Sequence, residues 1–379
     1  MRVLFGAPVG TGHLLPLVPT ARAAARAGHD VVFAATGANL ALLARQGFPV
    51  VEIAPDGTAE AAFRRLNART QVPGLPPADL LAHAADGWAE IGELVLDGML
   101  GAVERLRADV VVYEPYHVAG LVSAVLSGVP AVLHGTGLPM RTFRPALERM
   151  PRGFSQAEPT AAITVCPSSF TTPRRDRGLP MRYTPSDVEA AMPSWAAASP
   201  ARPRVCVTFG SVLAVPELLR AAVEGLRDLP VEVVLSTGGA EVAGLPENAH
   251  AAPWLPLSRL MPDCAAVVHH GGSGTTFGAL AAGVPQVVVP HGADQPVNAA
   301  AVTARGAGVQ VDAASAGAAS IREAIREVLG TPSYRVAARE LAEENAARPG
   351  ATQVLQEIAT LVRGRSAGRR AGLSRARYE

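Results

Sequence analysis

Two histidines, a glycine-rich turn and two threonines follow an apolar run in the segment VVHHGGSGTT, residues 267–276. Adjacent histidines at a strand end point to opposite faces, so only one of His269 and His270 can serve a metal site. A nucleophilic Ser273 would need the pattern Gly-x-Ser-x-Gly, but Thr275 occupies the last glycine position. A glycine turn that leads into a helix exposes backbone N–H groups and the positive end of the helix dipole. We therefore interpret the segment as a diphosphate site without a metal.

The first glycine turn of the chain, GAPVGTGH at residues 6–13, ends in His13. Its glycines are not in the Gly-x-Gly-x-x-Gly spacing of dinucleotide sites, and Ala34, Ala35 and Thr36 offer no acid for a ribose. We therefore expect no nicotinamide or flavin cofactor. An imidazole at this junction of loop and helix would face the crevice at the strand ends, where its ordinary pKa suits a general base. A helix-capping or surface role for His13 stays open at this point.

The composition argues against several classes of function. The net charge of +1 and the mean hydropathy of +0.20 do not suit a nucleic-acid-binding protein. All 34 basic residues are arginine, so there is no lysine for a phosphate-binding loop, a Schiff base or pyridoxal phosphate. No Asp-x-Asp pair is present to hold a metal against a nucleotide. Scattered cysteines, the lack of an apolar run of about 18 residues and the lack of a leader-like start favour a cytoplasmic protein without a membrane span.

Strand-like and helix-like segments alternate and indicate two similar halves. RVLFGAP, an alanine-rich helix and GHDVVFAAT make a β-α-β opening, and PRVCVTFGS restarts the pattern. SGVPAVLHGTG and AGVPQVVVPHG recur late in each half. We predict an α/β protein of two doubly wound Rossmann-like domains that face a central cleft. The predicted parts are a first domain at 1–190, an extended linker at 191–203, a second domain at 204–350, a C-terminal helix at 351–362 and a disordered tail at 363–379.

Several motifs together carry a resemblance to a known family: GTGH at 10–13, VVYEP at 111–115, TFGS at 208–211, WLP at 254–256, HHGGSGTT at 269–276 and PHGADQPVNA at 290–299. To about residue 362, the chain resembles the GT-B glycosyltransferases that glycosylate macrolide, enediyne, aromatic polyketide and glycopeptide antibiotics. The resemblance implies inverting, metal-independent transfer from a nucleotide sugar to a hydroxyl of a secondary-metabolite aglycone. Enzymes of this type commonly use dTDP-deoxysugars as co-substrates. No cofactor is implied, and a homodimer is compatible with the family.

The resemblance also implies roles for matching positions. His13 would be the general base, oriented by Glu114, which stands where the family has an aspartate that is one methylene shorter. The implied donor-binding residues are Ser211, Trp254, Leu255, His270, Gly272, Ser273, Gly274, Thr275, Asp294 and Gln295. Among them, Trp254 and Leu255 would hold the nucleobase. Asp294 and Gln295 would bind hydroxyls of the donor sugar. The acceptor wall is expected in loops at 56–90 and 135–152, with Phe63, Trp88, Met140 and Phe143 as apolar surface, although each of these could instead be core.

The choice of donor depends on a missing residue. Relatives that use UDP-sugars carry a glutamate eight positions after the diphosphate-binding histidine, and here that position is Gly278, next to Phe277. We therefore predict a dTDP-sugar donor, unless a distant acid such as Glu323 folds into the ribose site. A nucleotide-sugar 2-epimerase, a lipid-acceptor transferase of cell-wall synthesis and a non-catalytic auxiliary protein of the same fold stay as alternatives. The joint presence of a base, its carboxylate and two sugar-binding residues favours the transferase.

Overall fold

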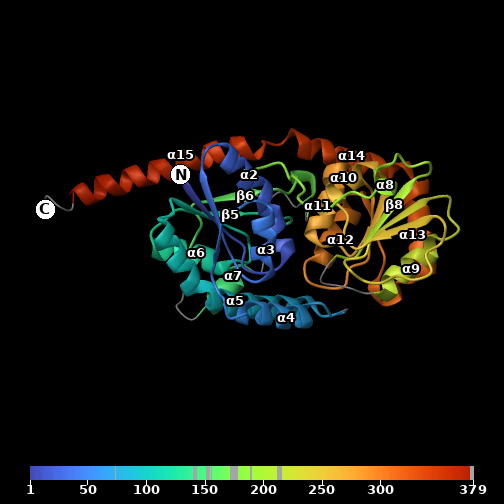
Figure 1. Ribbon diagram of the computed structural model, residues 1–379, viewed down its shortest axis with the longest axis horizontal. Coiled ribbons are helices and arrows are strands. Elements are labelled where there is room, and N and C mark those ends of the chain that lie inside the picture. The colour runs from blue at the N-terminus through green and yellow to red at the C-terminus, as the bar shows by residue number, and fades with distance from the viewer. Residues whose placement is uncertain are drawn as a thin grey trace.

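The computed structural model describes residues 1–72, 74–139, 143–150, 154, 156–170, 178–187, 190–210 and 216–375, without the side chains of Phe143 and of residues 364–375. Two lobes lie side by side along the long axis, and each contains one parallel sheet with helices packed on it (Figure 1). The predicted fold class, two Rossmann-like α/β domains, is confirmed.

The N-terminal lobe contains a seven-stranded parallel sheet in the order β3-β2-β1-β4-β5-β6-β7. Its strands are β1 (Arg2–Gly6), β2 (Asp30–Ala35), β3 (Val50–Glu52), β4 (Val110–Tyr113), β5 (Ala131–His134), β6 (Ala161–Thr164) and β7 (Leu179–Pro180). Its helices are α1 (Thr11–Leu14), α2 (Val18–Arg26), α3 (Ala38–Arg45), α4 (Thr58–Thr70), α5 (Pro77–Leu106), α6 (Val118–Leu126) and α7 (Phe143–Arg149), with short 3-10 helices at Leu15–Leu17 and Ser168–Phe170.

The C-terminal lobe contains a six-stranded parallel sheet in the order β10-β9-β8-β11-β12-β13. Its strands are β8 (Arg204–Thr208), β9 (Glu232–Ser236), β10 (Ala249–Ala252), β11 (Cys264–His269), β12 (Gln286–Val288) and β13 (Gly308–Gln310). The helices of this half are α8 (Ser194–Ala197), α9 (Pro216–Leu226), α10 (Leu257–Leu260), α11 (Ser273–Ala282), α12 (Gln295–Ala304), α13 (Ala318–Gly330), α14 (Pro332–Ala347) and α15 (Ala351–Arg375), with 3-10 helices at Met261–Asp263 and Ala313–Ser315.

The register of the central strands brings the functional loops together. The apolar runs VLFG and VVVY form β1 and β4, which are buried because apolar clusters cover both faces of the sheet. Gly6 pairs with Tyr113, so the loops that follow β1 and β4 leave the sheet side by side. In the second sheet Thr208 pairs with His269 in the same way. Both pairs of strands lie where the strand order changes direction, which is where doubly wound sheets bind ligands.

The C-terminal helix connects the two halves of the molecule. From the C-terminal lobe, α15 runs back over the N-terminal lobe, where Val354, Leu355 and Ile358 pack into the same apolar cluster as Leu17 on the approach to α2 (Figure 1). The helix continues beyond residue 362, where we predicted its end. Within the described residues, no helix combines the length and the apolar character that a membrane crossing requires.

The segment at 56–90 corrects the sequence-based expectation of loops. It forms α4 and the start of α5, which pack against each other. Ala59, Ala62 and Leu66 repeat at helical spacing and are buried, but nearby prolines and glycines obscure that period in the sequence. The wall where we expected the acceptor is therefore formed there by helices, which hold their side chains more rigidly than loops do.

Candidate active site

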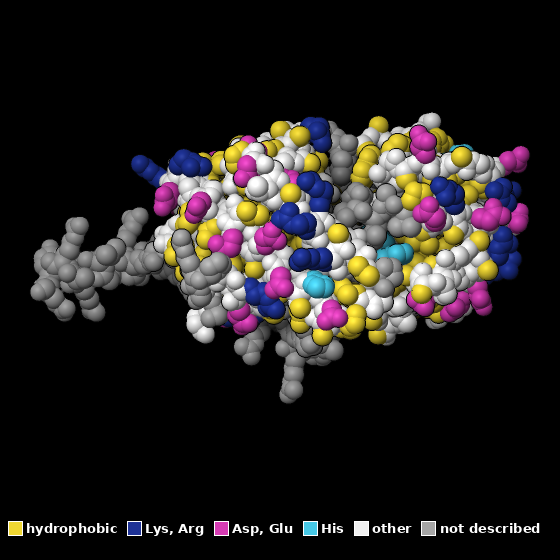
Figure 2. All heavy atoms as spheres, turned by 90° about the horizontal axis from the view of Figure 1, so that it is seen from below, with side chains coloured by type: hydrophobic (Ala, Val, Ile, Leu, Met, Phe, Trp, Pro, Cys, Tyr) yellow, Lys and Arg dark blue, Asp and Glu magenta, His cyan; other side chains and the backbone are white. Residues whose placement is uncertain are grey.

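A cavity of about 870 Å³ lies between the lobes, lined by residues that follow the carboxyl ends of strands in both sheets. Figure 2 shows the side of the molecule on which α4 and α5 lie; acidic and basic side chains are interspersed there, and neither sign forms a continuous field. The described residues of this face therefore form no broad basic patch of the kind that the lipid-acceptor alternative requires.

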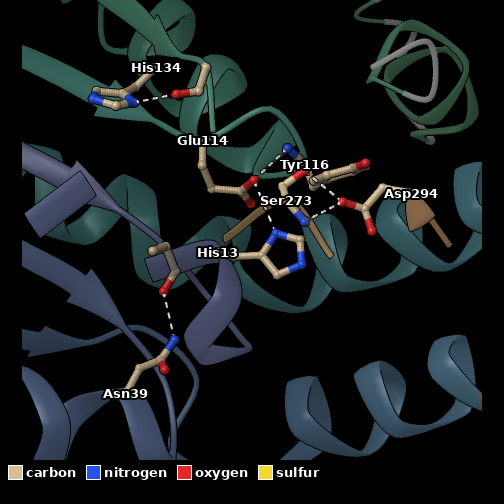
Figure 3. A network of polar contacts seen from close by, with 9 residues as sticks. His13, Asn39, Glu114, Tyr116, His134, Ser273 and Asp294 are labelled. Carbon is tan, nitrogen blue, oxygen red and sulfur yellow. Dashed lines mark hydrogen bonds and ion pairs between the residues drawn. The ribbon is translucent and has the colours of Figure 1, made fainter. Parts of the chain in front are cut away.

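His13 lies in the N-terminal wall of the cavity and contacts Glu114. The glycine turn after β1 places His13 on α1, with Gly10 in the left-handed region at φ 76°. Its Nδ1 lies 3.3 Å from Oε2 of Glu114, which follows β4 (Figure 3). The Tyr116 amide donates to the same oxygen at 3.0 Å, which fixes the orientation of the carboxylate. The longer glutamate therefore reaches the imidazole, as the sequence led us to expect.

The contact with Glu114 determines which nitrogen of His13 is basic. An ionised carboxylate only accepts hydrogen bonds, so Nδ1 carries the proton and Nε2 keeps the lone pair. The His13 side chain is 22% exposed, whereas Glu114 is fully buried. Burial lowers the pKa of His13, but the Glu114 carboxylate, and Asp294 more weakly, outweigh burial and hold this pKa above its usual 6.5. The pair has the arrangement of a general base with an orienting acid.

Aromatic rings surround His13 on the acceptor side. The His13 ring is 4.8 Å from that of Trp88, 5.2 Å from that of Tyr116 and 6.0 Å from that of Phe63, centroid to centroid. The cavity therefore contains Phe63 and Trp88 where an acceptor wall was expected. Tyr116 lines it too and stacks on Trp88; we had not assigned it a role, although it directly follows the VVYEP motif.

Two predicted residues of the acceptor wall and one predicted donor residue cannot be placed. Met140 and Ser211 lie outside the described residues, and Phe143 begins α7 without a described side chain.

The two adjacent histidines have separate surroundings, as predicted. His269 is buried, where its Nε2 is 2.9 Å from Oε1 of Gln286 and its Nδ1 accepts from the Gly271 amide. His270 lines the cavity between Gly210 and Gly272, which have no side chain to displace it. Only the second histidine is therefore available to a ligand.

His270 is a neutral donor near pH 7. Burial lowers its pKa to about 4, although the Asp294 carboxylate acts in the opposite direction. The Thr208 backbone also raises the pKa slightly, but no hydrogen bond of normal geometry reaches Nδ1 of His270 within the described residues. The neutral imidazole can donate one N–H to an anion. It carries no positive charge to neutralise a diphosphate unless binding of the diphosphate raises its pKa.

The first turn of α11 has backbone amides that are suited to bind an anion. Backbone N–H groups in the first turn of a helix have no acceptor within the helix. The amide of Ser273 donates to Oδ2 of Asp294 at 3.0 Å, which leaves the amides of Gly274 and Thr275 directed at the cavity that both residues line. No side chain caps the helix at Gly272. The turn is therefore suited to a diphosphate.

Asp294 is held by three donors on one oxygen. Its Oδ2 accepts from the amide and the hydroxyl of Ser273 (Figure 3). The same oxygen accepts from Nδ2 of Asn298. Oδ1 has no partner among the described residues. Oε1 of Gln295 accepts from the amides of His291 and Gly292, which leaves its Nε2 without a protein partner there. Asp294 and Gln295 thus offer one acceptor oxygen and one amide donor to a sugar. Asn298 lies in the motif PHGADQPVNA, but we had not assigned it a role.

Trp254, Leu255 and Gly278 also line the cavity from the C-terminal lobe. Trp254 is 43% exposed, so its ring is accessible to a base. A Cβ at position 278 would lie 3.4 Å from Sδ of Met261, so the apolar neighbour of this glycine is Met261. Phe277, which we had expected there, instead packs against other aromatic rings in the core.

Two acids, Glu323 and Asp187, are the candidate partners for a ribose hydroxyl near Gly278. Glu323 is exposed on α13 and is not part of the cavity lining. Asp187 does line the cavity, but its two oxygens accept from the amide and the hydroxyl of Ser258. The carboxylates of the described lining are Asp187 and Asp294, and Ser258 fixes the orientation of Asp187 with one hydrogen bond to each oxygen.

Comparison with known proteins identifies the family. Residues 80–210 and 220–361 match the N-terminal and C-terminal domains of the erythromycin biosynthesis protein CIII-like family. The L-demethylnoviosyl transferase of Streptomyces niveus is 36% identical over 376 residues, which cover 95% of this chain and 98% of that protein.

Solved structures agree with this assignment. The glycosyltransferase SsfS6 of Streptomyces sp. SF2575, complexed with thymidine diphosphate, matches with a TM-score of 0.80 and 31% identity over 95% of this chain and 99% of that one. The spinosyn rhamnosyltransferase SpnG, complexed with spinosyn aglycone, matches with a TM-score of 0.82 and 27% identity over 95% of this chain and 100% of that one. The chain therefore belongs to the erythromycin biosynthesis protein CIII-like family of glycosyltransferases from antibiotic-biosynthesis pathways.

Proposed function

We propose that the chain is an inverting glycosyltransferase that moves a deoxysugar from a dTDP-sugar to a hydroxyl of a secondary-metabolite aglycone without a metal ion. The observation that carries the proposal is a cavity in which one wall has a candidate base and the other has candidate donor-binding groups. The N-terminal wall has His13 on Glu114, and the C-terminal wall has the first turn of α11 beside Asp294. A base for the acceptor and a site for the donor face the same space, as direct transfer requires.

The proposed reaction is one displacement. Nε2 of His13 takes the acceptor proton while the oxygen attacks the anomeric carbon from the face opposite the nucleotide. The new C–O bond forms as the bond to the diphosphate oxygen breaks, and the electron pair leaves with dTDP. Glu114 stabilises the imidazolium, and the amides of Gly274 and Thr275 with the N–H of His270 stabilise the leaving diphosphate. One displacement inverts the anomeric centre.

The polar groups available to the sugar support a deoxysugar. Within the described residues, Asp294 has one uncommitted oxygen and Gln295 has one uncommitted amide nitrogen. A sugar hydroxyl that is buried without a partner costs about 1–3 kcal/mol. A sugar with fewer hydroxyls avoids that cost. The thymidine diphosphate bound to the related SsfS6 supports the choice of nucleotide.

The acceptor wall supports an apolar aglycone. In the described cavity lining, α4 and α5 contribute side chains such as Phe63, Leu66, Leu81 and Trp88, and none that is charged. The aglycone bound to the related SpnG supports an acceptor of this kind. The 2-epimerase alternative is not favoured, because the acids of the described lining are Asp294 and the Asp187 already committed to Ser258.

Product stereochemistry tests the proposal. We expect the protein, given a dTDP-sugar and a panel of polyketide aglycones, to form glycosides with the anomeric configuration opposite to that of the donor, such as β-linked glucosides from α-linked dTDP-glucose, because one displacement inverts the anomeric centre. The anomeric proton coupling constant in the NMR spectrum of the product measures this. A product with the configuration of the donor would contradict the single displacement, and epimerised donor without transfer would favour the epimerase.

We expect transfer to be insensitive to metal chelation, because the α11 amides and His270 supply the contacts to the diphosphate. The described residues contain no cluster of three or more His, Cys, Asp or Glu side chains that could hold a metal ion. The initial rate with and without EDTA should agree within about twofold. A loss of activity that Mg²⁺ or Mn²⁺ restores would contradict this expectation.

The pH profile of Glu114→Gln tests the role of the carboxylate. His13 must be neutral to act as a base, so kcat/KM falls as the pH drops through its pKa, which Glu114 holds above 6.5. Glutamine keeps a hydrogen bond but removes the charge, so the acidic limb should move to lower pH while the plateau falls about 10- to 100-fold. An acidic limb that stays in place would mean that another group sets it.

A further inference from the structure

The last turn of α4 contacts, across the cleft, the loop that bears Asp294. The Ala293 amide donates to the Thr70 carbonyl at 3.1 Å. Gly292 lies so close that a Cβ there would be 2.7 Å from Cα of Gln71, and nearer still to the Thr70 oxygen. Both neighbours are backbone atoms, so no rotation of a side chain could make room. The contact therefore requires glycine at position 292.

The Gly292–Ala293 loop has a backbone conformation that is unfavourable by itself, so neighbouring groups must stabilise it. Ala293 has φ 53°, in the left-handed region that residues other than glycine rarely adopt. From the C-terminal lobe, Gln295 accepts from the amides of His291 and Gly292. From the N-terminal lobe, the Thr70 carbonyl holds the amide of Ala293, the residue directly before Asp294. Both lobes thus position Asp294: Ser273 and Asn298 hold its side chain, and the Thr70 carbonyl of the other lobe holds the backbone directly before it.

The diphosphate site has no direct hydrogen bond to α4 among the described residues; its link to α4 is indirect, through the Ser273 amide that donates to Asp294. The amides at the start of α11 and the side chain of His270 belong to the C-terminal lobe, and no described hydrogen bond joins them to α4. The same helix α4 lines the acceptor compartment with Phe63 and Leu66. One helix therefore contacts both the acceptor space and the loop at the donor sugar, but not the nucleotide site.

We propose that the last turn of α4 is a positioning element for the donor sugar, which sets the Gly292–Ala293 loop, and through it Asp294, from the acceptor-binding lobe. The proposal rests on the proposed function of this site as a nucleotide-sugar site. Its consequence is that binding of the sugar, unlike binding of the nucleotide, requires the two lobes to be in contact. If acceptor binding moves α4, the Gly292–Ala293 loop moves with it, and Asp294 changes its position relative to the donor sugar.

The variant Gly292→Ala tests the proposal through a comparison of two ligands. Isothermal titration should show dTDP-glucose binding weakened by about tenfold, since a backbone hydrogen bond and the placement of Asp294 are lost together. The Kd of dTDP should stay within about twofold, because its contacts lie elsewhere. Gly330→Ala, at an open position on α13, should leave both affinities unchanged.

Two results would overturn the proposal: equal weakening of both ligands, or no weakening of either. A wild-type protein that binds neither dTDP nor dTDP-glucose would instead contradict the proposed function, and this inference with it. Hydrogen–deuterium exchange on the wild-type protein gives a test that does not depend on the variant folding. dTDP-glucose should slow exchange in peptides that contain residues 66–71 and 291–295 more than dTDP does. Equal protection by the two ligands would refute the coupling.

Discussion

Replacement of His13 by alanine is expected to lower kcat by about 100-fold or more, which is the usual scale for the loss of a general base. An acceptor hydroxyl has a pKa far above 7, so it attacks slowly unless a group accepts its proton. His13 lines the cavity with Nε2 basic, because the Glu114 carboxylate occupies Nδ1. Initial rates at saturating donor and acceptor measure the change.

Donor binding provides the control for this variant. The diphosphate contacts proposed here belong to the C-terminal lobe, so the Kd of dTDP should be unchanged in His13→Ala. His29→Ala is a matched substitution at the start of β2, away from the cavity lining, and it should retain wild-type turnover. Near-normal turnover in His13→Ala would remove this histidine from the mechanism.

The family resemblance implied the contact between His13 and Glu114, and the local pattern and the topology account for it. The apolar runs that form β1 and β4 are evident in the sequence, and parallel strands deliver the residues after them to one edge. The register that pairs Gly6 with Tyr113 then brings together two side chains that are 101 residues apart. The separate surroundings of His269 and His270 followed from the alternation of side chains along a strand.

Other features depend on contacts that no local pattern encodes. The buried face of α4 repeats at helical spacing, but the helix is stabilised by packing on α5, which the sequence does not reveal. Asn298 and Tyr116 lie in or beside the recognised motifs, yet their functions became visible only through the groups they touch, Asp294 and Trp88. The need for glycine at position 292 arises from backbone atoms in the other lobe.

The donor nucleotide is the second large effect that we predict: dTDP-sugars should be preferred over UDP-sugars by roughly 10- to 100-fold in kcat/KM. The two nucleotides differ at the 2′-hydroxyl of the ribose and at the 5-methyl group of the base. Gly278 offers no acceptor for that hydroxyl, and the nearest side chain to a Cβ there is the apolar Met261. A buried hydroxyl without a partner costs about 1–3 kcal/mol, and 1.4 kcal/mol corresponds to a factor of about ten in rate.

Competition between dTDP-glucose and UDP-glucose for one acceptor measures this preference directly, because both donors carry the same sugar. Glu323 is exposed and lies outside the cavity lining, so the acid that could weaken the prediction is Asp187, which lines the cavity and accepts one hydrogen bond from Ser258 on each oxygen. Gly278→Glu supplies the missing acceptor and should narrow the preference by raising kcat/KM for UDP-glucose. Equal use of the two donors by the wild-type protein, or a preference for UDP, would mean that the 2′-hydroxyl finds a partner elsewhere and that Gly278 does not set the choice of nucleotide.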